Sequence, residues 1–230
     1  MIPPPSEKII FVTGTDTGVG KTLLTASLLY HWQQQGVEVL AMKPFCSGGR
    51  ADVDLIQAIQ RSPLPDNKIN PFYFADPVAP LVAARALRQR IDLAEVLRRI
   101  RRVEQRCERL IIEGCGGVMV PLGEGYGVSD LIRRLRCRTI VVAGNKLGTL
   151  NHTLLTVRGL QSLPECRIKV LLMDGKTPDF SARTNHGILK ELLAPVEVLS
   201  LPYLGLNASG PGAIKNNHKK IKKVLAQLSG

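Results

Sequence analysis

The chain has 230 residues, of which 44% are hydrophobic, and a formal net charge of +12. This length fits one large domain or two small ones and allows roughly 70% of the unfolded surface to be buried. No apolar run approaches the roughly 18 residues that a membrane span requires, and the N-terminal MIPPPSEK lacks the features of an export signal. Five cysteines without a C-x-x-C pair indicate a reduced, cytoplasmic protein.

The excess of positive charge allows two interpretations. Much of it falls between residues 98 and 109, in a segment whose apolar residues keep a helical period. Such charge can indicate a nucleic-acid partner, but a solvated helix face explains this cluster better. We therefore expect no nucleic-acid partner.

The first predicted elements are a strand, a glycine-rich loop and a helix. Residues 9–12 form a β-branched and aromatic run too short for a helix, whereas Leu24 and Leu28 begin an apolar stripe on a helix starting near Thr22. With Gly-Lys-Thr at 20–22 between them, this is the pattern of a phosphate-binding loop. Glycines let backbone N–H groups close around phosphate oxygens, and the helix N-terminus adds a partial positive charge.

Two side chains of this loop carry the chemistry. Lys21 is placed to reach the β- and γ-phosphates, and the Thr22 hydroxyl to contact a magnesium ion. Gly14 stands one residue farther from the Gly-Lys pair than in the usual loop. The alternative is an ordinary glycine-rich turn with a surface lysine, but strand, loop and helix agree on the phosphate-binding interpretation.

The next predicted strand, over residues 37–42, completes a parallel β-α-β unit and is followed by Lys43 and Ser47. Ligands of open α/β sheets collect at the carboxyl ends of the strands, which places both residues near the phosphates. The alternative for Lys43 is a solvated surface lysine. Asp52 and Asp54 precede another apolar stripe: we interpret Asp52 as a helix N-cap, while Asp54 suits either capping or a metal contact.

Residues 62–80 are rich in proline and predict an irregular excursion over the surface. A strand over 110–113 then ends on Glu113, just before a glycine-rich stretch. An acidic residue at that position, facing a phosphate loop, suits a second magnesium contact; an exposed strand-end carboxylate is the alternative.

The second half of the chain predicts three more strands, over residues 139–143, 168–173 and 196–201. A helix is expected to start near Asn151, with N-terminal amides that suit a carboxylate, and His152 is interpreted as a structural histidine. The segment 214–228 reads as an amphipathic helix with a basic outer face. No repeat or linker divides the chain, so we expect one domain over residues 1–230.

Several motifs resemble the dethiobiotin synthetase family, in its order and at about its spacing, over nearly the whole chain. They are FVTGTDTGVGKT at 11–22, KPFCSG at 43–48, NPFYFADP at 70–77, EGCGG at 113–117, PL at 121–122 and KLGTLNH at 146–152. The resemblance implies an α/β, three-layer fold of the P-loop NTPase type, with a mostly parallel sheet and helices on both faces.

The family resemblance also implies a reaction. The substrate 7,8-diaminononanoate takes up CO2 as a carbamate, the carbamate attacks the γ-phosphate of MgATP, and the second amine displaces phosphate to close the ureido ring. Transfer of a phosphoryl group depends mostly on positioning and charge neutralisation, which agrees with the predicted site.

Residue roles follow from the same resemblance. Catalysis falls to Lys43, Lys21 and Thr17, and magnesium to Thr22, Asp54 and Glu113. Substrate contacts are expected from Thr17, Lys43 and Ser47, and from Thr149, Leu150 and Asn151 of a second subunit, which implies a homodimer. Nucleotide contacts are expected from Gly18, Val19, Gly20, Lys21, Thr22, Leu23, Asp54, Glu113, Gly114, Cys115, Gly116, Met173, Asp174, Pro202, Tyr203 and Leu204.

The chain departs from the family pattern at two positions of the nucleotide site. Glu often stands where this chain has Gly18, and an Asn-Asp pair where it has Met173 and Asp174. A thioether cannot replace an amide that reads the adenine edge, so base recognition is expected to be looser or to pass to the backbone at 202–204.

A rival class is the P-loop switch protein of the partitioning type, which binds DNA or membrane. The basic charge favours it, but such loops usually carry a second lysine where this chain has Thr15 and Asp16. An amidating synthetase of the same superfamily would need a glutaminase domain for which 230 residues leave no room. A non-catalytic relative would not be expected to keep Lys21, Lys43, Asp54 and Glu113 together.

Overall fold

A parallel six-stranded sheet forms the centre of the molecule in the computed structural model, which describes residues 6–61, 64–162 and 167–230. The features noted above at residues 1–5, Pro63 and Cys166 lie outside these ranges. Every strand of the sheet runs parallel to its neighbours. From one edge to the other the strands are β10 (Glu197–Leu201), β9 (Ile168–Asp174), β8 (Cys137–Asn145), β1 (Ser6–Gly14), β5 (Arg109–Gly117) and β2 (Val39–Met42).

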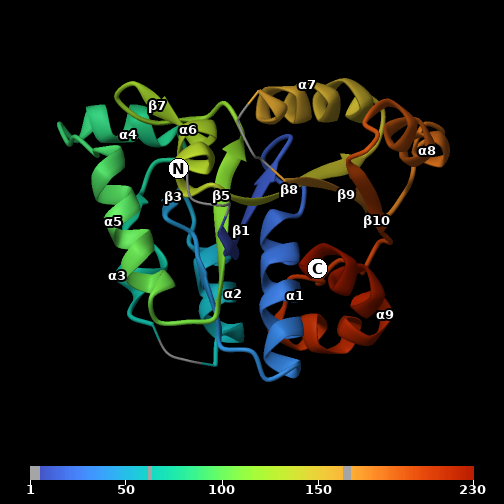
Figure 1. The fold of residues 1–230 in the computed structure, drawn as a ribbon, viewed down its shortest axis with the longest axis horizontal. Coiled ribbons are helices and arrows are strands. Elements are labelled where there is room, and N and C mark those ends of the chain that lie inside the picture. The colour runs from blue at the N-terminus through green and yellow to red at the C-terminus, as the bar shows by residue number, and fades with distance from the viewer. Residues whose placement is uncertain (1–5, 62–63, 163–166) are drawn as a thin grey trace.

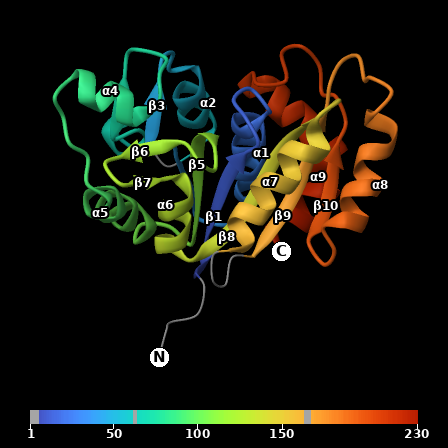
Figure 2. The same cartoon turned by 90° about the horizontal axis from the view of Figure 1, so that it is seen from above.

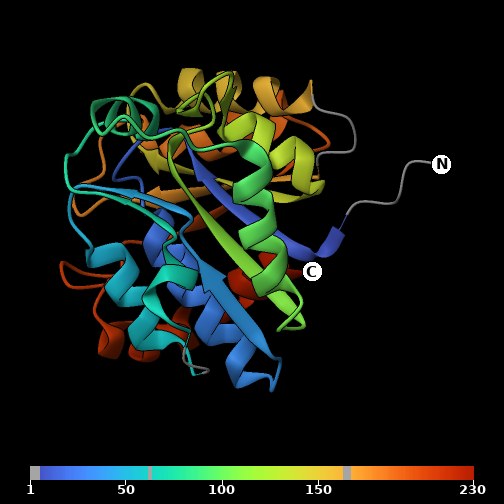
Figure 3. The ribbon, with the colours of Figure 1, turned by 90° about the vertical axis from the view of Figure 1, so that its left-hand side faces the viewer.

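Helices cover both faces of this sheet, which confirms the predicted three-layer α/β fold (Figures 1 and 3). One layer contains α1 (Lys21–Gln34), α2 (Ala51–Ile59) and α9 (Pro211–Ser229). The opposite layer contains α5 (Leu93–Glu104), α6 (Val128–Leu135), α7 (Thr149–Gln161) and α8 (Ala182–Leu192). Because parallel strands end at one edge, all the loops expected to carry function emerge on the same side.

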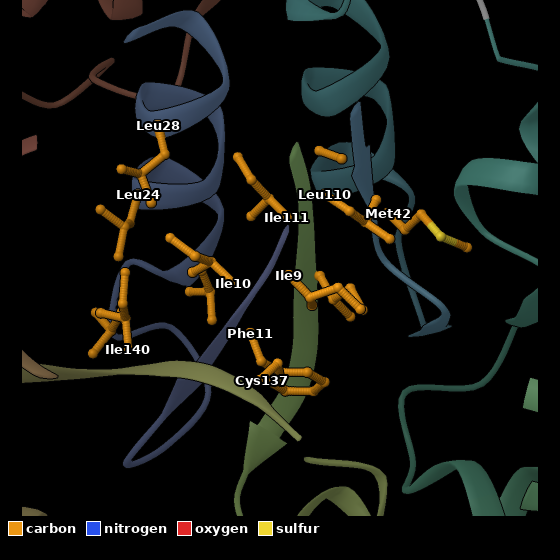
Figure 4. Close-up of a cluster of buried hydrophobic side chains, with 14 of the residues drawn as sticks. Ile9, Ile10, Phe11, Leu24, Leu28, Met42, Leu110, Ile111, Cys137 and Ile140 are labelled. Carbon is orange, nitrogen blue, oxygen red and sulfur yellow. The ribbon is translucent and has the colours of Figure 1, made fainter. Parts of the chain in front are cut away.

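The core is built from the residues that the apolar pattern selects. Leu24 and Leu28 of α1 point toward the sheet, where Ile10, Ile111 and Ile140 meet them (Figure 4). All five side chains are at most 1% exposed. Strands buried on both faces carry continuous apolar runs, which is why residues 9–12 do not alternate with polar ones. This packing fixes the ends of β1 and α1, and with them the loop between.

The segment over 62–80 is more ordered than its prolines predict, and the expectation of an irregular excursion is wrong for its described part. It contains α3 (Asp66–Ile69) and β4 (Phe72–Phe74), and β4 pairs in parallel with β3 (Phe45–Ser47). The rings of Phe45 and Phe72 stack with centroids 4.9 Å apart. Packing of these aromatic rings orders the segment although it is rich in proline, and attaches it to the end of β2.

The rest of the chain closes the two ends of the molecule (Figure 2). At one end α4 (Pro80–Ala86) packs against the hairpin of β6 (Pro121–Gly123) and β7 (Tyr126–Gly127). At the other end α9 packs on α1 through a buried stripe that includes Ile221 and Leu225, with its lysines exposed, as the amphipathic pattern predicts. Within the described ranges, no helix has the length and apolar character needed to cross a bilayer.

Candidate active site

The loop between β1 and α1 is shaped by glycines in the left-handed region. Gly18 has φ +73° and Gly20 φ +102°. The backbone of Gly20 therefore disfavours any side chain, and a Cβ there would also stand only 3.0 Å from the terminal methyl of Met173. Directly after Gly20, α1 begins at Lys21, which turns the helix N-terminus toward the loop. The arrangement is that of an anion-binding loop.

Beside this loop Lys43 is held between two carboxylates. Its Nζ donates a 2.6 Å hydrogen bond to Oε1 of Glu113 and another to Oδ2 of Asp52. The Thr22 hydroxyl donates a 2.8 Å bond to the same oxygen of Glu113. Lys43 is 5% exposed and Glu113 1%. Three segments distant in the chain thus meet at one polar cluster beside the loop.

The electrostatics of the cluster favour the charged forms of Lys43 and Asp52. Burial alone would lower the pKa of Lys43, but the Glu113 and Asp52 carboxylates outweigh it and raise that pKa above its usual range. For Asp52 burial opposes ionisation, yet the Lys43 ammonium lowers its pKa. Burial lowers the pKa of Lys21, against the attraction of Glu113. The Cys115 thiol nearby stays protonated, because burial raises its pKa to about 11.

The structure places Asp52, rather than Asp54, beside the cluster. Asp52 was expected to cap α2, but its carboxylate bonds Lys43, and the N-cap residue of α2 is Arg50. Successive helix positions are about 100° apart, so Asp54 lies on the other side of α2, where it is exposed. The position that the sequence analysis expected for Asp54 is thus held by Asp52, and the metal contact itself stays a prediction.

The residues around this cluster fit a magnesium ion. Oε2 of Glu113 is buried and, among the residues that the structure describes, has no hydrogen-bond partner. The carboxylate of Asp52 and the hydroxyl of Thr22 lie beside it. No trio of His, Cys, Asp or Glu within the described ranges is arranged as a metal site. These oxygens therefore suit Mg²⁺ that keeps waters and phosphate oxygens as its other ligands.

Two connected cavities open on either side of the loop. The first, here called the reaction lobe, is lined by the three predicted catalytic residues, by five other predicted contacts and by Asp52. In chain order they are Thr17, Lys21, Thr22, Lys43, Ser47, Asp52, Glu113, Cys115 and Gly116. The Ser47 hydroxyl is buried there and has no partner in the part of the chain that the structure describes. It is therefore available to a ligand.

The second cavity, here called the base lobe, lies at the carboxyl ends of β8, β9 and β10. Its lining includes the predicted nucleotide contacts Val19, Met173, Asp174, Pro202, Tyr203 and Leu204, and also Thr149. Gly18, Gly20 and Leu23 line both lobes. The loop thus lies between the compartment that holds Lys43 and Glu113 and the compartment that holds Met173 and Asp174.

A few predicted contacts lie outside both lobes. A Cβ on Gly114 would stand 2.9 Å from the Phe11 ring, so this glycine serves close packing beneath the site. Leu150 is half-buried and Asn151 exposed on α7, and neither lines a lobe of its own subunit. Their predicted role, contact with the substrate of a second subunit, stays a prediction.

The polar lining residues that sequence reasoning did not assign to the site include Asp52 in the reaction lobe and Asn145 in the base lobe. Asn145 is the last residue of β8 and donates a 2.8 Å hydrogen bond to Oδ1 of Asp174. The rule that strand ends carry ligands, which selected Asp174, would also have selected Asn145.

Comparison with solved structures agrees with this fold. A ParA family ATPase from Chlorobium tepidum TLS superposes with a TM-score of 0.62 over 97% of this chain and 98% of that one, at 14% identity. The MinC:MinD cell division protein complex of Aquifex aeolicus gives a TM-score of 0.58 over 94% and 96%, also at 14% identity. These likenesses concern the fold alone and do not support a DNA- or membrane-binding switch.

A protein-family model described as an AAA domain matches residues 8–206. Fold, loop and charged cluster together define an ATPase of the P-loop class. An ATP-dependent dethiobiotin synthetase of Bacillus licheniformis is 37% identical over 190 residues, 80% of each chain. One of Nitrosopumilus maritimus is 32% identical over 205 residues, 86% of this chain and 90% of the relative. The chain belongs to the ATP-dependent dethiobiotin synthetase family and is a ligase.

Proposed function

We propose that this chain closes the ureido ring of dethiobiotin from 7,8-diaminononanoate, CO2 and MgATP. One amine adds to CO2 and loses a proton, which gives a carbamate. A carbamate oxygen attacks the γ-phosphorus and displaces ADP, forming a carbamic-phosphoric anhydride. The second amine then attacks the carbamoyl carbon, loses a proton and expels phosphate as the ring closes.

The observation that carries this proposal is the buried Lys43 ammonium held between Glu113 and Asp52, beside Thr22 and the phosphate loop. Anionic oxygens build up where the carbamate meets the γ-phosphate, and a fixed cation there costs no reorganisation during the reaction. Lys21 stabilises the phosphates from the loop. Charge neutralisation and alignment are what phosphoryl transfer requires of a protein.

The remaining polar groups of the reaction lobe position the substrates. The hydroxyls of Thr17 and Ser47 bind the diamine or its carbamate, which supplies the partner that Ser47 lacks among the described residues. Thr22, Asp52 and Glu113 would hold Mg²⁺, which neutralises phosphate charge when it is bound with the nucleotide. The nucleoside part of ATP lies in the base lobe.

We also propose a homodimer with α7 at its interface. Leu147, just before α7, is 80% exposed, and Leu155 within the helix is 62% exposed. Large apolar side chains left in water near one helix favour a protein partner. In the dimer the N-terminal amides of α7, at Thr149, Leu150 and Asn151, bind the substrate carboxylate in the opposite subunit's site.

The test is phosphate release from MgATP and bicarbonate by the purified protein, with and without 7,8-diaminononanoate. Release that depends on the diamine, with dethiobiotin as product, is the expected result. Release that ignores the diamine and rises with DNA or anionic vesicles would instead indicate the partitioning type of ATPase.

A further inference from the structure

The base lobe raises the question of which nucleobase it selects. If a nucleoside triphosphate binds at the loop, as the proposed function requires, its reacting end lies in the reaction lobe with Lys43, Asp52 and Glu113. The base is then directed to the other side of the loop, where β8, β9 and β10 end. The residues of that side therefore decide which base is accepted.

At the ends of β9 and β10 two residues that line the base lobe, Met173 and Pro202, offer little hydrogen bonding to a base. The Met173 side chain lies against the loop, with its terminal methyl about where a Gly20 side chain would stand. A thioether donates no hydrogen bond and accepts only weakly, and Pro202 has no backbone N–H. The Tyr203 hydroxyl is buried and, like that of Ser47, has no hydrogen-bond partner within the described residues. Met173 and Pro202 therefore hold a base by contact rather than by hydrogen bonds to its edge.

A small hydrogen-bond network occupies the side-chain amide of Asn145, the one side-chain amide among the described residues that line the base lobe. Nδ2 of Asn145 donates to Oδ1 of Asp174 at 2.8 Å and to the Ala182 carbonyl at 3.1 Å. Its Oδ1 accepts from Nδ2 of Asn185 at 3.0 Å. Asn145 is 6% and Asn185 2% exposed. The amide of Asn145 is therefore fully engaged in orienting the Asp174 carboxylate.

Asp174 itself retains a free acceptor. It is half-buried and lines the base lobe, and within the described part of the chain no group donates to its Oδ2. An ionised carboxylate can only accept hydrogen bonds. Lys146 also lines the lobe, but it is exposed at the rim and its ammonium is solvated.

We propose that Asp174 selects nucleobases that bear an exocyclic amino group, so that ATP and CTP bind and ITP and UTP are disfavoured. The amines of adenine and cytosine donate to the fixed carboxylate. Hypoxanthine and uracil place a carbonyl oxygen at the same position, and two acceptors facing each other leave both without a partner. Because the bond in question is a hydrogen bond to a charged group, we expect bases with the amino group to bind about tenfold or more tightly than bases without it.

The test is calorimetric titration of the protein with Mg²⁺ and each of ATP, ITP, CTP and UTP, without the diamine so that no dethiobiotin forms. The two pairs CTP/UTP and ATP/ITP are matched in size and differ in the amine. We expect CTP to bind about tenfold more tightly than UTP, and ATP more tightly than ITP by a similar factor.

Two variants test whether the base preference comes from Asp174 or from a neighbouring residue of the lobe. Asp174→Asn keeps an oxygen for the bond from Asn145 and presents an N–H₂ donor in place of Oδ2. UTP and ITP should therefore bind more tightly, and the CTP/UTP and ATP/ITP affinity ratios should fall to about one. Lys146→Met should leave both ratios unchanged. Thermal unfolding of each variant checks that it is folded.

Equal affinity of the wild-type protein for CTP and UTP would overturn the inference while leaving the synthetase activity in place. So would a ratio that survives in Asp174→Asn or disappears in Lys146→Met. Failure of all four nucleotides to bind would overturn the proposed function as well.

Discussion

The ion pairs of Lys43 give it a structural role beside the catalytic role proposed for it. Replacing it with alanine removes the cation that meets the carbamate and phosphate charges, and we expect turnover to fall about a thousandfold. The change also leaves the Glu113 carboxylate, 1% exposed, without its ion-pair partner. Breaking a buried ion pair costs about 3 kcal/mol of unfolding free energy. Urea unfolding and dethiobiotin formation measure the two effects.

A Lys43→Arg variant is the matched control for this prediction. It keeps the positive charge beside Asp52 and Glu113 but moves the donors, so it should recover most of the stability and little of the turnover. Normal turnover in Lys43→Ala would contradict the catalytic role.

Asp52 and Asp54 form a matched pair for testing the metal site. Asp52→Asn removes a charge from the reaction lobe, and we expect the magnesium concentration for half-maximal activity to rise about tenfold or more. Asp54→Asn changes an exposed carboxylate on the far side of α2. In this variant the magnesium concentration for half-maximal activity should stay within about twofold of the wild-type value. Activity against magnesium concentration distinguishes them; the reverse order would restore Asp54 as the ligand.

The sequence could not decide between these two aspartates. Both stand within the first turn of a predicted helix, where either can cap or reach a metal. Which one faces the site depends on how α2 is rotated against the sheet, and that rotation is set by packing of Val53 and Ile56, both 0% exposed. Lys21 and Thr22 needed no such information, because the phosphate loop fixes them locally.

At the scale of elements, a histidine pair joins α1 to α9. Nδ1 of His31 and Nε2 of His218 are 3.0 Å apart, and the Tyr30 ring meets His218 edge-on at 5.2 Å. Burial lowers the pKa of both histidines, and the Lys222 ammonium adds to the effect; the neighbouring His218 lowers the pKa of His31 further. The contact is therefore made by neutral rings.

This pair predicts the sign of the pH dependence of stability. Each folded-state pKa lies below the value of 6.5 in the unfolded chain. Above pH 6.5 neither state is protonated and stability is unaffected; as the pH falls below 6.5 the unfolded chain gains protons first and stability declines. The urea midpoint should drop between pH 7.5 and 5.5, and drop less in the His31→Asn, His218→Asn double variant. An equal drop in both proteins would exclude the pair as the cause.

Local pattern predicted the central elements well and the peripheral ones poorly. The predicted strand over 139–143 lies inside β8, and the helix expected from Thr22 begins one residue earlier. By contrast β3 and β4 have three residues each. Strands this short have no periodicity of their own, and they form because the Asn70 amide bonds the Lys43 carbonyl at 2.8 Å and the aromatic rings stack.

At the scale of the whole molecule, the proposed dimer can be tested through Leu155. Leu155→Arg places a charge on the exposed apolar face of α7, and we expect a monomer by sedimentation, because burying an unpaired charge in an interface is costly. The amides of α7 would then no longer reach the opposite site, so the KM for the diamine should rise about tenfold or more while ATP affinity stays within about twofold. Leu87→Arg, at a leucine 57% exposed on the opposite end of the molecule, is the control and should remain a dimer. A Leu155→Arg protein that is monomeric yet keeps its KM would show that each subunit binds the substrate carboxylate by itself.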